Sequence, residues 1–94
     1  MIHVLVRATV EDLQRWKSIF EENAPLRKNA GSMGVHVYSK AGDPNEVMIL
    51  GEYADKEKAM QMFQSQEFRE AAARAGVKGP PEVTFLDEVV KLPA

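Results

Sequence analysis

The chain has 94 residues, 45% hydrophobic and 28% charged, with a formal net charge of −2 at pH 7, which fits one globular domain over residues 1–94. The sequence has neither a block of basic residues nor any cysteine, which argues against nucleic-acid binding through phosphate contacts and excludes disulfides, thiolate catalysis and Cys-bound metal centres. No apolar run approaches the roughly 20 residues that cross a membrane, and the N-terminal residues lack the layout of a signal peptide, so we expect a cytoplasmic protein.

The first third of the chain predicts a strand followed by a helix. Apolar, largely β-branched residues alternate over residues 2–8, which is typical of a strand with one buried face. Thr9 then offers a hydroxyl as the helix N-cap, with Asp12 three positions later, close to a capping box. Pro25 disfavours a straight continuation and favours a short second turn. The buried stripe of the helix is predicted at Leu13, Trp16 and Phe20.

A β-hairpin is predicted in the middle of the chain. Residues 33–40 and 47–53 are its two strands, and residues 41–46 connect them. Within this connection the segment Asp43-Pro44-Asn45 is the predicted turn, because proline presets the backbone dihedral and its neighbours tolerate tight geometry.

The register of this hairpin is left with two alternatives. If Tyr38 faces Met48 across the pair, then His36 and Tyr38 share one face of the sheet with Met48. A slip of one residue would instead place His36 and Tyr38 with Ile49 and Gly51. The sequence does not choose between these faces.

The last third of the chain predicts a second helical stretch and a closing strand. Asp55 and Ser65 are the predicted helix N-caps, and Gly76 stands where a left-handed C-terminal glycine belongs. Gly79-Pro80-Pro81 is interpreted as an extended connection, followed by a strand over residues 82–92. The buried residues of the first part of this helical stretch are predicted to be Ala59, Met62 and Phe63.

The order of these elements predicts an α+β, ferredoxin-like βαββαβ fold. It is a four-stranded antiparallel sheet with helices on one face. The alternation in the hairpin is poor, because Val35 and Val37 alternate with His36 and Tyr38, and both faces therefore carry large side chains. We expect the helix-free face to be covered by a second copy of the chain, which makes a homodimer.

Four stretches of the sequence carry a resemblance to a known family: residues 4–7, 12–20, 43–47 and 65–76. In order and spacing they resemble the dimeric α+β barrel superfamily, and within it the antibiotic-biosynthesis-monooxygenase-like branch with its uncharacterised short members. The resemblance implies that two ferredoxin-like subunits join their sheets and that each keeps a small-molecule pocket between its sheet and its helices. Relatives of this kind include cofactor-free oxygenases of aromatic polyketides, haem-degrading enzymes, lactone isomerases and proteins without a demonstrated reaction.

Three residues are the candidates for catalysis. His36 lies in the middle of a strand, and its imidazole can exchange a proton near neutral pH; a histidine satisfied by a carboxylate such as Glu52 is the alternative interpretation. Tyr38 points the same way two residues later and could polarise a substrate oxygen, or simply pack. Arg7, one strand away, could bind a substrate carboxylate or enolate, or form a surface ion pair.

Aromatic residues are the candidates for substrate binding, since small-molecule pockets are mostly apolar. Core packing would explain the same residues equally well. For Trp16 the resemblance adds that an indole and a tyrosine line the pocket in cofactor-free oxygenases. The candidate residues are Trp16, Phe63, Phe68 and Phe85.

No cofactor and no metal are predicted. His3 and His36 are the only histidines, neither falls in a predicted helix, and no metal-binding or dinucleotide motif accompanies them. The first functional hypothesis is a cofactor-independent monooxygenase or isomerase-like enzyme that acts on a small aromatic or enolisable molecule. The alternative is a non-catalytic homodimer that binds a small hydrophobic ligand or serves a structural role.

Overall fold

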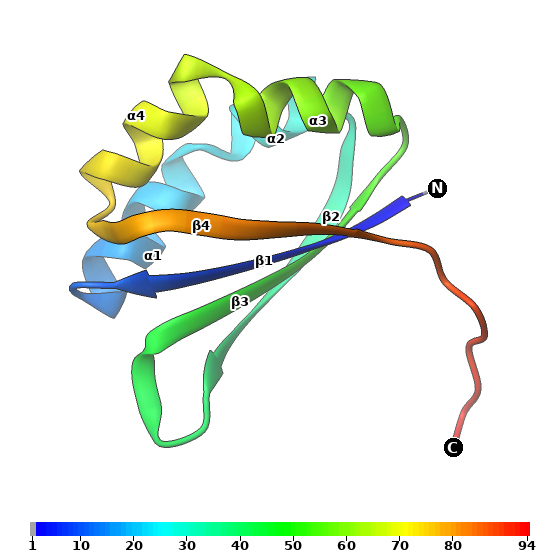
Figure 1. Ribbon diagram of the computed structural model, residues 1–94, viewed down its shortest axis with the longest axis horizontal. Helices are drawn as coiled ribbons and strands as arrows, with labels where there is room; N and C mark the ends of the chain where they lie inside the picture. The colour runs from blue at the N-terminus through cyan, green and yellow to red at the C-terminus, as the bar shows by residue number, and fades with distance from the viewer. Residues whose placement is uncertain (1) are drawn as a thin grey trace.

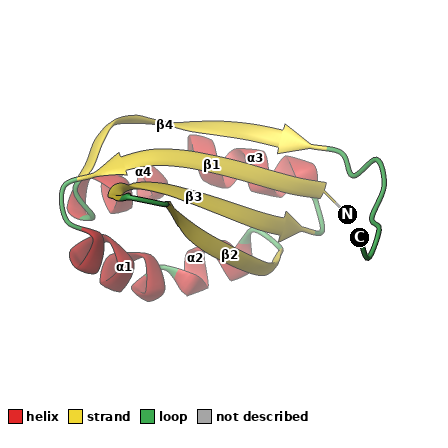
Figure 2. Cartoon of the chain, turned by 90° about the horizontal axis from the view of Figure 1, so that it is seen from below, coloured by secondary structure: helices red, strands yellow, loops and turns green. Residues whose placement is uncertain are grey.

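The computed structural model describes residues 2–94 and shows a four-stranded antiparallel sheet with helices on one face (Figure 1). The elements are β1 (Ile2–Val10), α1 (Leu13–Glu22), α2 (Ala24–Asn29), β2 (Ser32–Lys40), β3 (Asp43–Tyr53), α3 (Lys56–Gln64), α4 (Gln66–Arg74) and β4 (Val77–Leu86). The strand order across the sheet is β2-β3-β1-β4, and the ferredoxin-like βαββαβ prediction is confirmed, with each helical stretch divided into two helices. Seen from below, the strands pass in front of α3 and α4 (Figure 2).

The core lies between the sheet and the helices. The alternation in β1 buries every second side chain against the helices, whereas Leu5 is half-buried and Arg7 is exposed on the other face. Alternate residues of β3 are buried in the same way, and Ala59 and Met62 of α3 belong to the same core. The buried residues of the two central strands are Val4, Val6, Ala8, Val10, Val47, Ile49, Gly51 and Tyr53. Within residues 2–94, no helix combines the length and the apolar character needed to cross a membrane.

The start of α1 differs from the prediction. Asp12, not Thr9, is the N-cap, and its carboxylate accepts hydrogen bonds from the backbone N–H groups of Gln14 (3.0 Å) and Arg15 (3.3 Å). Thr9 still belongs to β1, and its hydroxyl donates a hydrogen bond to Glu46 on the neighbouring strand. Pairing with β4 thus extends β1 beyond the point at which local propensity predicts a helix. The caps predicted at Asp55 and Ser65 are confirmed.

The hairpin turn also lies earlier than predicted. Lys40 pairs with Asp43, so Ala41 and Gly42 form the turn, and Gly42 takes the left-handed conformation with φ 84°. The predicted turn segment 43–45 is instead the beginning of β3. The first of the two predicted registers is confirmed, because Tyr38 faces Met48.

The closing strand begins and ends earlier than predicted. β4 includes Gly79-Pro80-Pro81, which the sequence analysis interpreted as a connection. As an edge strand, β4 pairs only with β1, so prolines that cannot donate a ladder hydrogen bond are tolerated there. The register between β1 and β4 shifts beside these prolines, between Arg7 and Thr9. The last pair joins Leu86 to His3 near the start of β1, and beyond it the chain has no partner strand and leaves the sheet (Figure 1).

Candidate functional site

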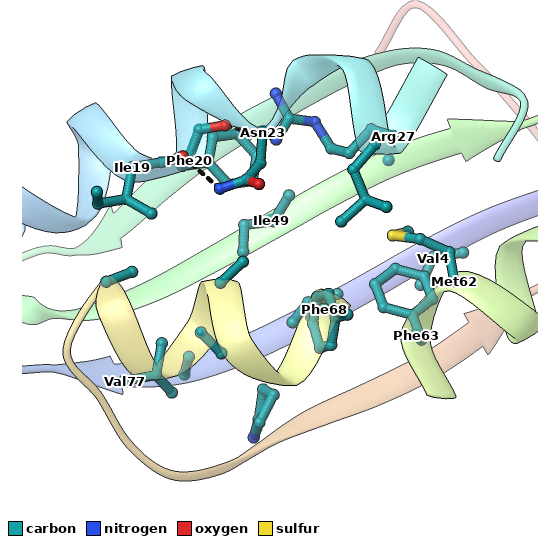
Figure 3. Close-up of a pocket in the computed structure, with 18 of the residues that line it drawn as sticks. Val4, Ile19, Phe20, Asn23, Arg27, Ile49, Met62, Phe63, Phe68 and Val77 are labelled. Atoms are coloured by element: carbon teal, nitrogen blue, oxygen red, sulfur yellow. Dashed lines mark hydrogen bonds between the residues drawn. The ribbon is translucent and has the colours of Figure 1, made fainter. Parts of the chain in front are cut away.

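A cavity with a volume of about 80 Å³ lies between the sheet and the two helical stretches (Figure 3). The central strands β1 and β3 form its floor, α1 and α2 one wall, and α3 and α4 the other. Its lining consists of Val4, Val6, Ala8, Trp16, Ile19, Phe20, Asn23, Leu26, Arg27, Ile49, Gly51, Tyr53, Met62, Phe63, Phe68, Ala71, Ala72, Ala75, Val77 and Pro81.

The lining is almost entirely apolar. Only Asn23, Arg27 and Tyr53 bring an amide, a cation or a hydroxyl to the cavity. An apolar enclosure with a few polar groups at one place is the usual composition of a small-molecule site. The polar groups therefore define where a ligand would be oriented.

Two of the three polar groups are positioned by the junction of α1 and α2. Asn23 ends α1 and precedes α2, and its amide Nδ2 donates to the backbone carbonyl of Ile19 at 2.8 Å (Figure 3). This bond uses one N–H of the amide and leaves the second N–H and the side-chain oxygen available to a ligand. Pro25 stands in the first turn of α2, where the absence of its N–H costs no helical hydrogen bond. The bend at this junction brings the next turn of the chain to the cavity.

Arg27 is held by a stack of planar groups. Its guanidinium carbon lies 3.8 Å from the centroid of the Phe20 ring, and the Phe20 ring in turn stacks on Trp16 with centroids 4.8 Å apart. Arg27 Nη1 also donates to the backbone carbonyl of Phe20 at 2.6 Å. A guanidinium has five N–H donors, so most of them remain for a ligand. The stack fixes the orientation of the cation at low entropic cost.

The electrostatics of the site favour an anion. Burial lowers the pKa of Arg27, and the neighbouring Tyr53 acts in the opposite direction. Burial raises the pKa of Tyr53, an effect that Arg27 partly offsets. Near neutral pH the pair is therefore a cation beside a neutral phenol. Among residues 2–94 no carboxylate lies within ion-pair distance of Arg27, and a half-buried cation without such a partner is suited to a negatively charged ligand.

The raised pKa of Tyr53 predicts a loss of stability at alkaline pH. Above pH 10 the unfolded chain releases the phenol proton before the folded chain does, so the free energy of unfolding falls as the pH rises, by at most about 1.4 kcal/mol per pH unit. Tyr53→Phe should remove this contribution, so its stability should decline less steeply above pH 10 in urea titrations. Tyr38→Phe is the control, because Tyr38 is the only other tyrosine and is 54% exposed. Equal slopes for Tyr53→Phe and the wild type would contradict the interpretation.

The structure brings three of the four predicted binding residues to the cavity. Trp16, Phe63 and Phe68 line it, and the Phe63 and Phe68 rings meet edge to face at 5.2 Å. Phe85 lies behind this wall, with its ring 6.3 Å from that of Phe63, and does not line the cavity. Its role is therefore to support Phe63.

The three predicted catalytic residues lie on the other face of the sheet. His36 and Tyr38 are exposed on β2 with ring centroids 6.4 Å apart, and Arg7 is exposed on β1. Met48 of β3 stands between Arg7 and Tyr38 in the register. The strand pleat separates all three from the cavity, so a ligand there cannot contact them in the same chain. Their catalytic role remains a prediction for the helix-free face, which we define as His3, Leu5, Arg7, His36, Tyr38, Met48, Leu50, Glu52, Glu82, Thr84 and Leu86.

The three polar residues of the cavity were not predicted from the sequence as site residues: Asn23, Arg27 and Tyr53. The proline after Asn23 signalled a second turn but not the direction of its side chains, which depends on the angle of the bend. Within residues 2–94, no group of three or more His, Asp or Glu side chains is placed to hold a metal ion.

Comparisons with known proteins agree on the fold. The profile of the family described as antibiotic biosynthesis monooxygenase matches residues 1–74. A Bordetella bronchiseptica structure named for that family has 18% sequence identity and a TM-score of 0.78, covering 95% of this chain and 97% of that one. SnoaB, a cofactor-independent oxygenase from Streptomyces nogalater, has 15% identity and a TM-score of 0.79, covering 99% and 97%. No curated protein matches the chain.

Proposed function

Because the chain belongs to the antibiotic biosynthesis monooxygenase family, we propose that it is a cofactor-independent oxygenase whose site is the cavity between the sheet and the helices. The observation that supports this most is that Arg27, the one cation lining an almost entirely apolar and aromatic enclosure, has no ion-pair partner among residues 2–94. The likeness to SnoaB, which is a cofactor-independent oxygenase, agrees with this assignment. The proposed substrate is a small phenol or another enolisable aromatic molecule.

The proposed reaction uses the electron-rich anion of the substrate itself. The phenolate of a substrate such as 1-naphthol reacts with O₂ at the ring carbon opposite the phenolate oxygen, and that carbon becomes a carbonyl carbon. One atom of O₂ enters the carbonyl and the other leaves as water, together with the ring hydrogen and the phenol proton. The substrate loses four electrons and O₂ accepts four, so 1-naphthol and O₂ give 1,4-naphthoquinone and water.

Arg27 supplies what this reaction needs from the protein. An opposite charge within about 4–6 Å lowers the pKa of an acid by roughly 1–3 units, so a phenol beside the guanidinium ionises at lower pH. The same cation stabilises negative charge as it moves onto oxygen, and the apolar walls keep competing water away. The Tyr53 hydroxyl and the second N–H of the Asn23 amide are the donors that would orient the substrate oxygens.

The other ionisable group of the cavity, Tyr53, has a raised pKa and stays protonated near neutral pH. It is therefore a hydrogen-bond donor rather than a base. The substrate must contribute its own acidity, and the rate is expected to rise with pH through the pKa of the bound phenol.

We expect the purified protein to consume oxygen when given 1-naphthol, without any added cofactor and after treatment with a chelator. An oxygen electrode measures the uptake, and absorbance identifies 1,4-naphthoquinone as the product. Phenol and anthrone, with one and three rings, bracket the size of the substrate. Binding of these compounds without oxygen uptake above the spontaneous rate would overturn the proposed activity and leave a ligand-binding protein.

We also propose that the protein pairs with itself through the helix-free face. Proteins of this family are typically homodimers. The centre of the face is apolar, since Leu5 and Leu50 are direct neighbours across β1 and β3 and Met48 lies next along β3. Two pairs of ionisable side chains flank this centre, with Arg7 opposite Glu82 and His3 opposite Glu52. A second copy is the simplest cover for such a face.

A further inference from the structure

A second hollow lies directly beside the cavity. It is an open groove between α2 and the α3–α4 turn, with a volume of about 380 Å³. Polar side chains from both walls line it, among them Asn29, Lys58 and Gln61. Two apolar side chains, Leu26 and Met62, line both the groove and the cavity. The two hollows therefore adjoin at these side chains.

We propose that this groove is the entrance to the cavity and that Leu26 and Met62 form the gate between them, an inference that rests on the proposed function of the cavity as a ligand site. Met62 is suited to this role because its unbranched thioether side chain rotates about three bonds. In Figure 3 the Met62 side chain reaches from α3 toward the α2 side of the cavity. Leu26 faces it from α2, a helix of only six residues.

The sizes of the cavity and the groove determine how a larger substrate can bind. A cavity of about 80 Å³ is well below the roughly 300–1,000 Å³ of sites for drug-sized ligands. A ligand with two or more rings must therefore widen the cavity or extend past the gate. The groove offers space for that part of the molecule, together with amide and ammonium groups for polar substituents. The fitting ligand is an aromatic molecule with its reactive ring at Arg27 and a polar end in the groove.

The test measures the rates of ligand binding. Trp16 lines the cavity and is the only tryptophan in the chain, so its fluorescence reports on the cavity alone. 1,4-Naphthoquinone, the product of the proposed reaction, should quench it, and the chain has no cysteine with which the quinone could react. Stopped-flow mixing over a concentration series gives the association and dissociation rate constants.

Gln61→Phe is the main variant, and Gln64→Phe is its matched control. Both positions are exposed on α3, but only Gln61 lines the groove. If the groove is the entrance, Gln61→Phe should slow both association and dissociation, association by at least about fivefold, because an obstruction raises the barrier in both directions. Gln64→Phe should behave like the wild type.

Replacing the gate itself gives a second measurement. Met62→Leu keeps the volume and removes the flexibility, so it should slow both rates, whereas Met60→Leu on the same helix lines neither hollow and should not. Unchanged association rates in both Gln61→Phe and Met62→Leu would overturn the gate. A change in the dissociation rate alone would also overturn the gate, since Met62 would then be only part of the cavity wall. No quenching in the wild type would instead contradict the proposed ligand site.

Discussion

Arg27→Met is expected to lower kcat/KM for 1-naphthol by about 100- to 1,000-fold, the usual loss when one group that stabilises a developing oxyanion is removed. Arg27 is the one cation that lines the cavity, and no carboxylate among residues 2–94 neutralises it. Methionine keeps the length and apolar contact of the side chain against Phe20 but removes the charge. The loss should therefore lie mainly in kcat, because the charge develops as the substrate ionises and reacts.

The pH profile separates an electrostatic role from a structural one. In the wild type the rate should rise with pH through the lowered pKa of the bound phenol, and in Arg27→Met this rise should move to higher pH by roughly 1–3 units. Arg27→Lys should restore part of the shift, since it keeps the charge but not the stacked plane. A variant that was merely misfolded would lose activity at every pH, and thermal unfolding would show it.

Two control variants locate the chemistry. Lys28→Met removes a cation from the next position of α2, but Lys28 is exposed and does not line the cavity, so kcat/KM should stay within about twofold of the wild type. His36→Ala should also retain turnover, because His36 lies on the helix-free face. Loss of turnover in His36→Ala with an intact Arg27→Met would move the site to that face and restore the role predicted from the sequence.

The fold could be predicted because its signals are local and repeated. The alternation in β1 fixes which residues face the helices, and the caps at Asp55 and Ser65 and the glycine at position 76 mark helix ends without tertiary context. The errors arose where pairing between distant strands overrides local preference. Thr9 has the chemistry of a cap but belongs to β1, because β4 pairs with the strand up to Val10.

The candidate site could be predicted only in part. Trp16, Phe63 and Phe68 were found because a buried aromatic stripe and a pocket wall have the same sequence pattern. The register of His36 was left with two alternatives, because periodicity does not show which face the helices cover. Arg27 could not be found, since its direction depends on the bend at Asn23 and on stacking against Phe20. The proposed catalytic chemistry thus depends on the packing of two short helices, which no local pattern encodes.

Leu50→Glu is expected to convert the proposed homodimer into a monomer that remains folded. Leu50 lies on β3 between Leu5 of β1 and His36 of β2, at the centre of the helix-free face. In a single chain this face is open, so the new carboxylate would be hydrated and the fold unaffected. In a two-fold dimer both copies would bury an unpaired charge, and a cost of about 4 kcal/mol corresponds to an association weaker by about 1,000-fold.

Sedimentation equilibrium at micromolar concentration measures this directly, since the wild type should have twice the 10.5 kDa mass of one chain and Leu50→Glu should have the mass of one. Gln64→Glu adds the same charge on the exposed side of α3 and should remain dimeric. A monomeric wild type, or a dimeric Leu50→Glu, would show that this face is not the interface. Oxygen uptake by the monomeric variant then decides a further point. Because the cavity lies on the helix-covered side of the sheet, opposite the proposed interface, the monomer should retain turnover, and its loss would mean that the partner contributes to the site.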